Sequence, residues 1–255
     1  MRALSLNTRR KLAAHLFVIA LLAVWTVAAL RLPGYVLPAP LTVLERVGDF
    51  FISVKLASHA AASIFHVAAA LVLAFAIGTA LALAGRYLPI TRVLIGRLSA
   101  FLNSFSSVGW ALLAILWFGL NDIAVIFVIG IILLPIYMIN MQAALDQLDS
   151  ELLEMTASFT RSWPRAFTLV VLPALYPFML ATTRIAFGIA WKVALTAELF
   201  GGNSGFGFLV NLARQDIDTS RIFAVIALMI VISFLADHLL FAPLERHLTR
   251  HYADA

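Results

Sequence analysis

The chain has 255 residues, of which 63% are hydrophobic and 12% are charged, and its mean hydropathy is +0.99. A soluble domain is nearer half apolar and a quarter charged, so much of this apolar surface must face lipid. The formal net charge of +5 comes from basic residues that flank apolar runs without forming a patch, which argues against nucleic acid as a partner. Because the chain has no cysteine, disulfides, thiolate metal sites and cysteine nucleophiles are excluded.

Apolar runs of membrane-crossing length predict an all-α membrane protein with six transmembrane helices. A helix needs about 20 residues to cross roughly 30 Å of hydrocarbon. The first run is too long for the core of a signal peptide and is followed by a poor cleavage site, so we expect it to be retained. The predicted helices, in a single transmembrane domain over residues 1–255, occupy residues 12–30, 58–84, 98–119, 123–144, 172–198 and 222–243.

The basic residues predict how these helices are oriented. With the N-terminus inside the cell, most Lys and Arg residues outside the spans fall on the cytoplasmic side, as the positive-inside rule requires. We therefore expect a multi-pass protein of the bacterial cytoplasmic membrane. Its N-terminal tail (1–11), the loop 146–171 and the C-terminal tail (245–255) are expected in the cytoplasm.

The loop 146–171 is unusually polar for a connection between two membrane helices. Leu152, Met155, Thr156 and Phe159 recur at helical spacing, which predicts a short helix with one mostly apolar stripe. Ser162, with Pro164 two residues on, is typical of a second helix start. The pattern alone is compatible with a connector lying on the bilayer surface and with a docking element for a cytoplasmic partner.

The same loop resembles the EAA loop of binding-protein-dependent ABC importer permeases, which inserts into a groove of the ATPase subunit. Glu154 stands at the opening Glu of that pattern and Pro173 at its closing Leu-Pro. Thr160 replaces the usual Gly, and since Thr adopts a left-handed backbone only at a cost, the turn there is expected to differ. The resemblance assigns coupling to the ATPase to Glu154, Met155, Thr156, Phe159, Thr160, Phe167 and Pro173.

Four further phrases, one of them in two parts (183–191 and 197–201), are similar to this family and follow its order. They are Leu37-Pro38-Ala39-Pro40, the stretch 114–120, the stretch 183–191, the stretch 197–201 and Ser204-Gly205-Phe206-Gly207. The branch that they resemble most is that of the nitrate, sulfonate and taurine permeases. The resemblance implies a type I ABC importer permease fold, a homodimer of permease subunits and two ABC ATPase subunits that use ATP and Mg. It also implies a periplasmic or lipid-anchored substrate-binding protein.

Three ionisable residues fall within the fifth predicted helix: Arg184, Lys192 and Glu198. Such residues are costly inside a bilayer and are retained where they are paired or line water. Lys192 and Glu198 are six residues apart, about 240° around the helix, so each needs a partner elsewhere. Arg184, Trp191, Lys192 and Glu198 are candidates for a translocation pathway favouring an anion, and the alternative is that they make interhelical hydrogen bonds or snorkel.

Glycines and histidines mark the outer side. Gly201, Gly202, Gly205 and Gly207 allow a tight turn, which is either a solvent-exposed turn or an outer gate and contact for a binding protein. The stretch 208–214 that follows is compatible with a short interfacial helix. His59 and His66 share a helix face two turns apart, too far to bind one metal ion, so we interpret them as core or interface histidines. Asp237 is interpreted as a snorkelling or capping residue.

The motifs that the chain lacks limit its function. No Gly-Lys pair exists, which excludes a phosphate-binding loop of the G-x-x-x-x-G-K-[ST] kind, and we predict no catalytic residue, bound cofactor or metal site. We therefore expect a permease subunit, not an enzyme, that imports a small anionic solute such as a sulfonate, taurine or nitrate. The alternatives are a self-contained secondary transporter, which would show internal repeats, and a non-transporting membrane scaffold.

Overall fold

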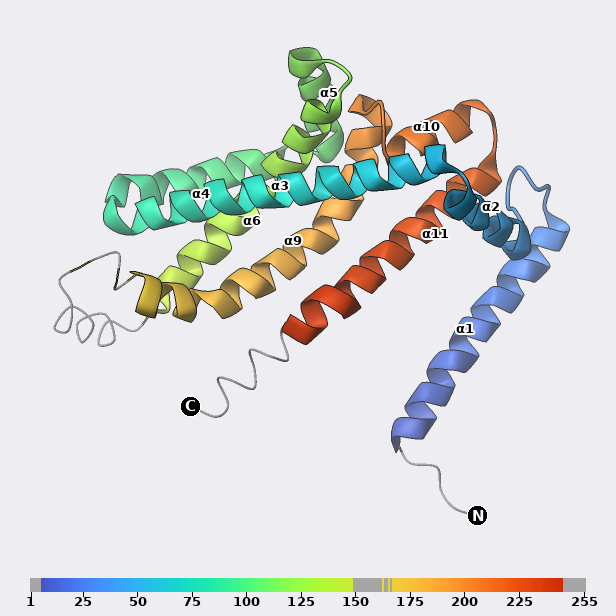
Figure 1. Cartoon of the computed structure of the whole chain (residues 1–255), viewed down its shortest axis with the longest axis horizontal. Coiled ribbons are helices and arrows are strands. Elements are labelled where there is room, and N and C mark those ends of the chain that lie inside the picture. The colour runs from blue at the N-terminus through green and yellow to red at the C-terminus, as the bar shows by residue number, and fades with distance from the viewer. Residues whose placement is uncertain (1–5, 149–161, 163–164, 166, 245–255) are drawn as a thin grey trace. The chain divides into compact units, whose positions relative to one another are not determined.

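The computed structural model describes residues 6–148, 162, 165 and 167–244, and these residues form helices and no strand. Figure 1 shows the helices with their labels. Their bounds are α1 Leu6–Arg31, α2 Pro40–Ile52, α3 Val54–Tyr87, α4 Pro89–Ser104, α5 Ser107–Phe118, α6 Asp122–Asp146, the π-helix η1 Phe167–Val171, α9 Leu172–Gly201, α10 Phe206–Gln215, α11 Thr219–Ala236 and the π-helix η2 Asp237–Phe241. The all-helical membrane fold predicted from the sequence is confirmed.

The described helices account for most of the predicted spans. Four of them are long and apolar enough to cross a membrane, namely those covering Val54–Arg86, Asp122–Asp146, Phe167–Gly201 and Thr219–Leu244. A fifth arises if α4 and α5 count as one broken span, and the apolar part of α1, His15–Arg31, is shorter. The predicted number of six transmembrane helices is therefore not fully reproduced among the described residues, because one predicted helix is broken and another has a short apolar part.

The break between α4 and α5 corrects the prediction of one straight helix over residues 98–119. The two helices meet at 93°, and Figure 1 shows α5 turning sharply away from α4. Ser106 begins the second helix, since its side chain accepts a hydrogen bond from the Gly109 amide at 3.2 Å. A serine in this position satisfies an amide that has no partner in the first turn of a helix.

The chain divides into two compact units. The first comprises Met1–Ala57 and Leu209–Leu228, and the second comprises Ser58–Phe208 and Met229–Ala255. In the first unit, the indole of Trp25 donates to the Pro38 carbonyl at 3.1 Å, and the Thr219 hydroxyl donates to the Tyr35 carbonyl at 2.6 Å. Helix α2, which lies between the first two predicted spans, belongs to this unit, and its Arg46 forms an ion pair with Asp218 at 3.4 Å.

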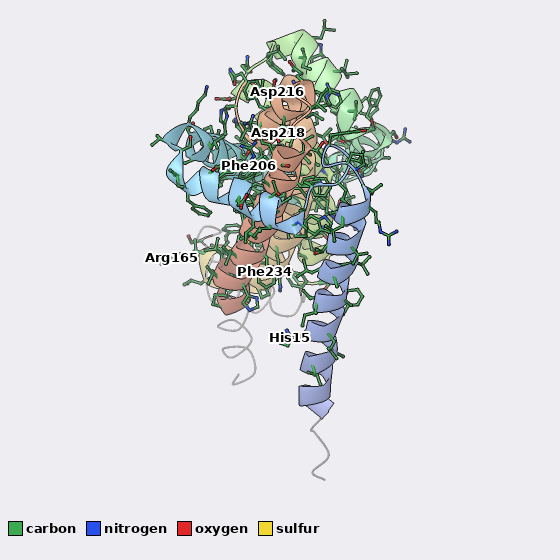
Figure 2. All side chains as sticks on the ribbon, turned by 90° about the vertical axis from the view of Figure 1, so that its right-hand side faces the viewer. His15, Arg165, Phe206, Asp216, Asp218 and Phe234 are labelled. Atoms are coloured by element: carbon green, nitrogen blue, oxygen red, sulfur yellow. The ribbon has the colours of Figure 1, made fainter. Side chains whose placement is uncertain are left out.

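The link between α10 and α11 also belongs to the first unit. Asp216 and Asp218 lie close together there, as Figure 2 shows, and Arg221 reaches both carboxylates at 3.8 and 3.6 Å. Ile217 between them has a φ of 56°, the left-handed conformation that β-branched residues rarely adopt.

The core of the second unit is built around α6. This helix is apolar on every side, as expected of a helix that other helices surround. It packs along α9 and also against α4 and α5. Against α3 the approach is close enough that a Cβ on Gly78 would lie 2.6 Å from the Tyr137 Cβ. The buried residues of α6 are Ala124, Val125, Val128, Ile129, Leu133, Pro135, Tyr137, Met138, Met141, Ala144 and Leu145.

Two arginines hold the C-terminal end of α6. Arg86 donates to the Leu145 carbonyl at 2.7 Å, and Arg92 forms an ion pair with Asp146 at 2.7 Å. Cations at this position complement the partial negative charge of a helix C-terminus. They fix the point from which the chain leaves for the loop 146–171, most of which lies outside the described residues.

Candidate functional site

A polar stripe on α3 forms one side of the site. His59, Ser63 and His66 follow one another at i, i+4 and i+7, so they share one face of an otherwise apolar helix. Ser63 and His66 are fully buried in the second unit. Polar side chains at such positions need partners from other elements, because an unpaired polar group in an apolar surrounding is costly.

Glu198, near the end of α9, is the principal partner of this stripe. Its side chain is 1% exposed and accepts three hydrogen bonds. They come from the Ser63 hydroxyl at 2.8 Å, the Nδ1 of His66 at 2.9 Å and the Gly207 amide at 2.9 Å. Hydrogen bonds and a nearby imidazole together compensate the burial of a carboxylate. We call Ser63, His66 and Glu198, with His59, the Glu198 cluster.

The Glu198 cluster caps the N-terminus of α10. The Gly205 amide donates to Nδ1 of His59 at 3.2 Å, and the Phe206 amide donates to the Ser63 hydroxyl at 2.8 Å. Together with the Gly207–Glu198 bond, three successive amides at the start of the helix are satisfied by side chains of α3 and α9. The first amides of any helix lack intrahelical partners, and a carboxylate is favoured beside them. A cap supplied by residues so far away in the chain ties three elements together.

The glycines of residues 201–207, the glycine loop, are required by this close packing. Gly205 has a φ of +97°, and a Cβ there would collide with the Glu198 carboxylate. A Cβ on Gly207 would collide with the Leu195 carbonyl and lie 2.6 Å from the Leu199 amide. Gly205, Phe206 and Gly207 are buried, so this part of the loop is not the solvent-exposed turn that the sequence left open.

Asp122 extends the cluster toward the surface of the second unit. Its Oδ1 lies 3.2 Å from Nε2 of His66, at ion-pair distance although without the geometry of a hydrogen bond. The Ser204 hydroxyl donates to the same oxygen at 3.0 Å. Asp122 is 52% exposed, whereas His66 is 0% exposed. A buried imidazole therefore lies between one buried and one accessible carboxylate.

Arg184 and Asp237 form a second polar contact, between α9 and η2. The guanidinium donates from Nε to Oδ1 at 2.7 Å and from Nη2 to Oδ2 at 2.9 Å, a bidentate arrangement. Arg184 thus has its partner on another helix, and its acceptor is Asp237, which the sequence pattern indicated as a snorkelling or capping residue. Asp237 is the first residue of the π-helix η2, a local widening that is often found at functional positions.

The other two pathway candidates differ in their surroundings. Trp191 is buried, with its ring 6.0 Å from that of Phe187 and 6.4 Å from that of Phe206. Lys192 is exposed on α9, and the described part of the chain offers its ammonium group no ion pair. The structure therefore places Trp191 in the core of the second unit and Lys192 on its surface.

Most residues assigned to coupling lie outside the described part of the chain. These are Glu154, Met155, Thr156, Phe159 and Thr160. Of the remaining two, Phe167 is the first residue of η1 and Pro173 lies in the first turn of α9, where proline is well tolerated.

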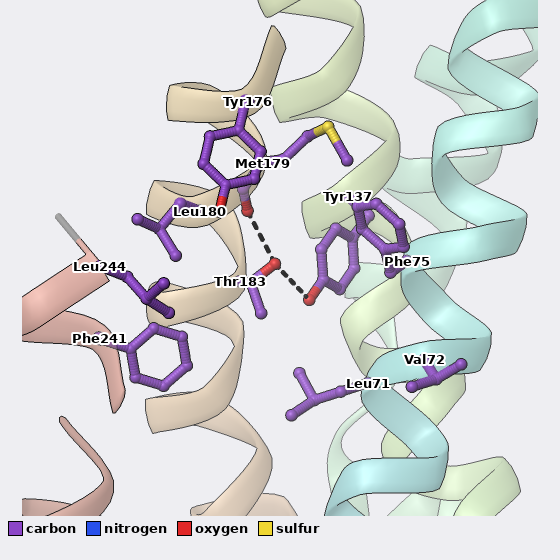
Figure 3. A pocket seen from close by; sticks show the side chains of 10 residues that line it. All are labelled: Leu71, Val72, Phe75, Tyr137, Tyr176, Met179, Leu180, Thr183, Phe241 and Leu244. Carbon is purple, nitrogen blue, oxygen red and sulfur yellow. Dashed lines mark hydrogen bonds between the residues drawn. The ribbon is translucent and has the colours of Figure 1, made fainter. Parts of the chain in front are cut away.

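An apolar pocket of about 350 Å³ lies between α3, α6, α9 and the end of the chain's last described helix. Figure 3 shows Phe75, Tyr137 and Phe241 on its walls. Its polar groups bond to one another, since the Tyr137 hydroxyl donates to Thr183 at 3.3 Å and Thr183 donates to the Met179 carbonyl at 2.7 Å. Among the described residues that line the pocket, none carries a charge.

The sequence alone did not reveal that Ser63 and His66 contact Glu198, or that Asp122 contacts His66. One signal was present, because His59, Ser63 and His66 form a polar stripe at helical spacing within a long apolar run. The stripe indicates that α3 has a polar partner, but not which one, since Ser63 and Glu198 are 135 residues apart. Among the described residues, no group of three His, Cys, Asp or Glu side chains could hold a metal ion.

Comparison with known proteins identifies the family. The family model described as binding-protein-dependent transport system inner membrane component matches residues 74–246, more than half of the chain. A permease protein of Bacillus subtilis named for aliphatic sulfonates transport, SsuC, is 29% identical over 203 residues, covering 79% of this chain and 73% of that protein. The taurine transport system permease protein TauC of Escherichia coli is 27% identical over 236 residues, covering 90% and 86%.

A third relative is named for a different solute. The riboflavin transport system permease protein RibX of Chloroflexus aurantiacus is 32% identical over 143 residues, covering 56% of this chain and 53% of that protein. The matched region 74–246 includes Glu198, the Arg184–Asp237 pair and the loop 146–171, whereas the α3 members of the Glu198 cluster precede it. The chain belongs to the family of inner membrane components of binding-protein-dependent transport systems, in the branch of ABC permeases that includes those named for sulfonates and taurine.

Proposed function

We propose that this chain is the membrane-spanning subunit of an ATP-driven importer for a small anionic solute, in which two copies form the pathway. The family match over residues 74–246 is the observation that carries the proposal. A periplasmic or lipid-anchored binding protein would deliver the solute on the side of the glycine loop. Two ABC ATPase subunits would supply energy on the opposite side.

The loop 146–171 is the proposed receiver of that energy. The chain has no phosphate-binding loop of its own, so ATP and Mg must act on a separate subunit. Arg86 and Arg92 anchor the helix that leads into the loop, and η1 leads from the loop directly into α9. A displacement of the loop would thus act on α6 and α9, the two helices that form the centre of the second unit.

An anionic solute is supported by two observations. Lys192 exposes its charge on an apolar helix without an ion pair from the described residues, and such a residue is typical of a surface that meets water or a charged ligand. Two relatives are named for sulfonates and taurine. Sulfonates carry a negative charge that an ammonium group attracts.

The experiment that tests this function is reconstitution of the complex in lipid vesicles, with the ABC ATPase and the binding protein that the proposal requires. ATP-dependent uptake of radiolabelled taurine or an alkanesulfonate is the expected result. Uptake of labelled riboflavin but not of a sulfonate would overturn the anionic substrate and leave the importer. Uptake that needs neither ATP nor the ATPase subunit would overturn the importer itself.

Lys192→Met tests the role of the charge. The variant is expected to assemble and hydrolyse ATP while uptake of the anion falls by about tenfold or more, equivalent to about 1.4 kcal/mol or more at the transition state. Lys192→Arg, which keeps the charge, is the matched control and is expected to retain most of the uptake. Equal uptake by the Met and Arg variants would contradict a role for the charge.

Glu154→Arg tests the loop as the receiver. This charge reversal is expected to weaken co-purification of the ATPase and to abolish ATP-dependent uptake. Unchanged complex formation and unchanged uptake would contradict the assignment of Glu154 to coupling.

A further inference from the structure

The length of α9 suggests how the two sides of this permease communicate. The helix begins at Leu172, directly after η1, and its 30 residues end at Gly201, the first residue of the glycine loop. At 1.5 Å per residue it extends for about 45 Å. One continuous helix therefore leads from the loop 146–171 to the glycine loop.

Glu198 lies at the end of this helix that is remote from the loop 146–171. It is hydrogen-bonded both to α3, through Ser63 and His66, and to the start of α10, through the Gly207 amide. The backbone adds a further tie, since the Gly202 amide donates to the Glu198 carbonyl at 3.1 Å. At Gly207 the loop lies directly against the backbone of α9, since a Cβ there would lie 2.6 Å from the Leu199 amide.

We propose that Glu198 is the positioning residue that locks the glycine loop to α9 and α3, so that a displacement of α9 driven from the loop 146–171 moves the glycine loop with it. The inference rests on the proposed function and assigns a role that the family membership does not. Without Glu198, the Gly207 amide and the Ser63 hydroxyl lose their acceptor. The loop would then be released from the helix while the ATPase contact, at the other end of α9, stays in place.

The chemistry of the cluster predicts which substitutions release the lock. Glu198→Ala removes all three acceptor contacts. Glu198→Gln is isosteric, and its amide oxygen can still accept from Ser63 and Gly207 while its NH₂ group donates to Nδ1 of a neutral His66. A residue that acts by positioning the loop should therefore be rescued largely by Gln and not by Ala.

Transport measurements on the reconstituted complex form the first arm of the test. For Glu198→Ala we expect assembly and basal ATP hydrolysis close to those of the unsubstituted complex. Uptake is expected to fall by about tenfold or more, because the lost buried hydrogen bonds are worth about 1.4 kcal/mol or more. Glu198→Gln is expected to restore most of the uptake. Ser99→Ala is the matched control, because Ser99 is also buried but its hydroxyl makes no hydrogen bond to the described residues.

Cysteine labelling forms the second arm of the test. If Glu198 only stabilised the fold, its replacement would not change how the labelling rate depends on the nucleotide. The chain has no cysteine, so Asn203→Cys places a single thiol at an exposed position of the glycine loop. With the lock intact, the rate of reaction with a membrane-impermeant maleimide is expected to change when the ATPase is trapped with ATP. In the Glu198→Ala background we expect a faster rate that no longer depends on the nucleotide.

The outcomes separate this inference from the proposed function. If uptake and nucleotide-dependent labelling in the Glu198→Ala background equal those with Ser99→Ala, the lock is overturned while the importer stands. If Glu198→Ala does not assemble, Ser63→Ala takes its place. This variant removes one donor to Glu198 and the acceptor of the Phe206 amide, and it is judged by the same two measurements, uptake and nucleotide-dependent labelling. If the unsubstituted complex shows no ATP-dependent uptake, the proposed function fails, and the resting labelling rates with and without Glu198 still decide whether this residue holds the loop.

Discussion

A single carboxylate, that of Glu198, joins the polar side chains of α3 to the start of α10. Burying an ionised carboxylate is costly unless donors compensate it. Glu198 has three donors, and one of them is an amide at a helix N-terminus, where negative charge is favoured. The rotation between Lys192 and Glu198 correctly indicates that they do not pair. The actual partners, Ser63 and His66, come from a helix more than 100 residues earlier in the chain.

Gly207 is a position at which an added methyl group would meet the backbone of a neighbouring helix. The Cβ of Gly207→Ala would collide with the backbone of Leu195 and Leu199, which cannot move without displacing α9. We expect a loss of about 3 kcal/mol or more in stability, beyond the usual cost of overpacking. The measurement is the apparent melting temperature of the detergent-solubilised protein.

Gly188→Ala is the matched control for Gly207→Ala. Gly188 lies in the interior of α9, and a Cβ there would meet no atom within 4 Å. Replacing an interior helix glycine by alanine is expected to stabilise by up to about 1 kcal/mol. Similar melting temperatures for the two variants would contradict the close packing of the glycine loop on α9.

The Arg184–Asp237 pair supports a prediction about additivity. Each side chain is about 40% exposed in the single chain, so in water the ion pair would contribute little to stability. In a bilayer, however, removing one partner leaves the other charge without its counter-ion. We expect Arg184→Ala and Asp237→Ala each to lower the apparent melting temperature in lipid nanodiscs, and the double variant to be no worse than the poorer single variant. Strictly additive losses would show that the two side chains do not act as a pair.

At the level of the elements, the end of α10 carries a local conflict between sequence and conformation. The Asp218 amide donates to the Ala213 carbonyl at 2.8 Å and the Ile217 amide to the Arg214 carbonyl at 3.3 Å, which together form a Schellman motif. The left-handed position of this motif favours glycine, yet it is occupied by Ile217 with a φ of 56°. The motif itself is therefore stabilised by its hydrogen bonds against the preference of the residue.

Ile217→Gly is expected to raise the stability of this link. A left-handed backbone costs an ordinary residue about 1–2 kcal/mol, and Ile217 is 72% exposed, so little packing is lost. We expect a gain of about 1 kcal/mol, read as an increase in the apparent melting temperature. Ile217→Val keeps the β-branched side chain and should show no gain. A lower melting temperature for Ile217→Gly would contradict the conformation assigned to this link.

The break between α4 and α5 shows why the boundaries of apolar helices are hard to predict. Residues 98–119 lack Asp and Glu and contain no proline, so an apolar run of this length predicts one straight helix. The local signal for two helices is Ser106, which caps the second one. A serine inside a membrane helix more often bonds to a carbonyl of its own helix, as Ser104 does with Ala100. The packing of α4 and α5 on α6 decides between the two.

For the whole molecule, orientation in the membrane is the property on which the proposed function depends most. The distribution of basic residues predicts that the loop 146–171 is cytoplasmic and that the glycine loop faces the other side. In intact cells, Asn203→Cys is expected to react with a membrane-impermeant maleimide, and Ser162→Cys is expected to react only after the membrane is permeabilised. The reverse pattern would exclude coupling to a cytoplasmic ATPase through the loop 146–171.

The sequence by itself determined that this protein is an all-α membrane protein, because an apolar run long enough to cross a bilayer can satisfy its backbone only as a helix. The order of its motifs also indicated the permease family, which the comparisons confirmed. Only the tertiary structure decided that Glu198 caps α10 with the help of α3, and that Arg184 binds Asp237. The contacts of Glu198 with α3 and of Arg184 with Asp237 join residues more than 50 positions apart, and their geometry depends on how whole helices pack, which no local pattern of residues specifies.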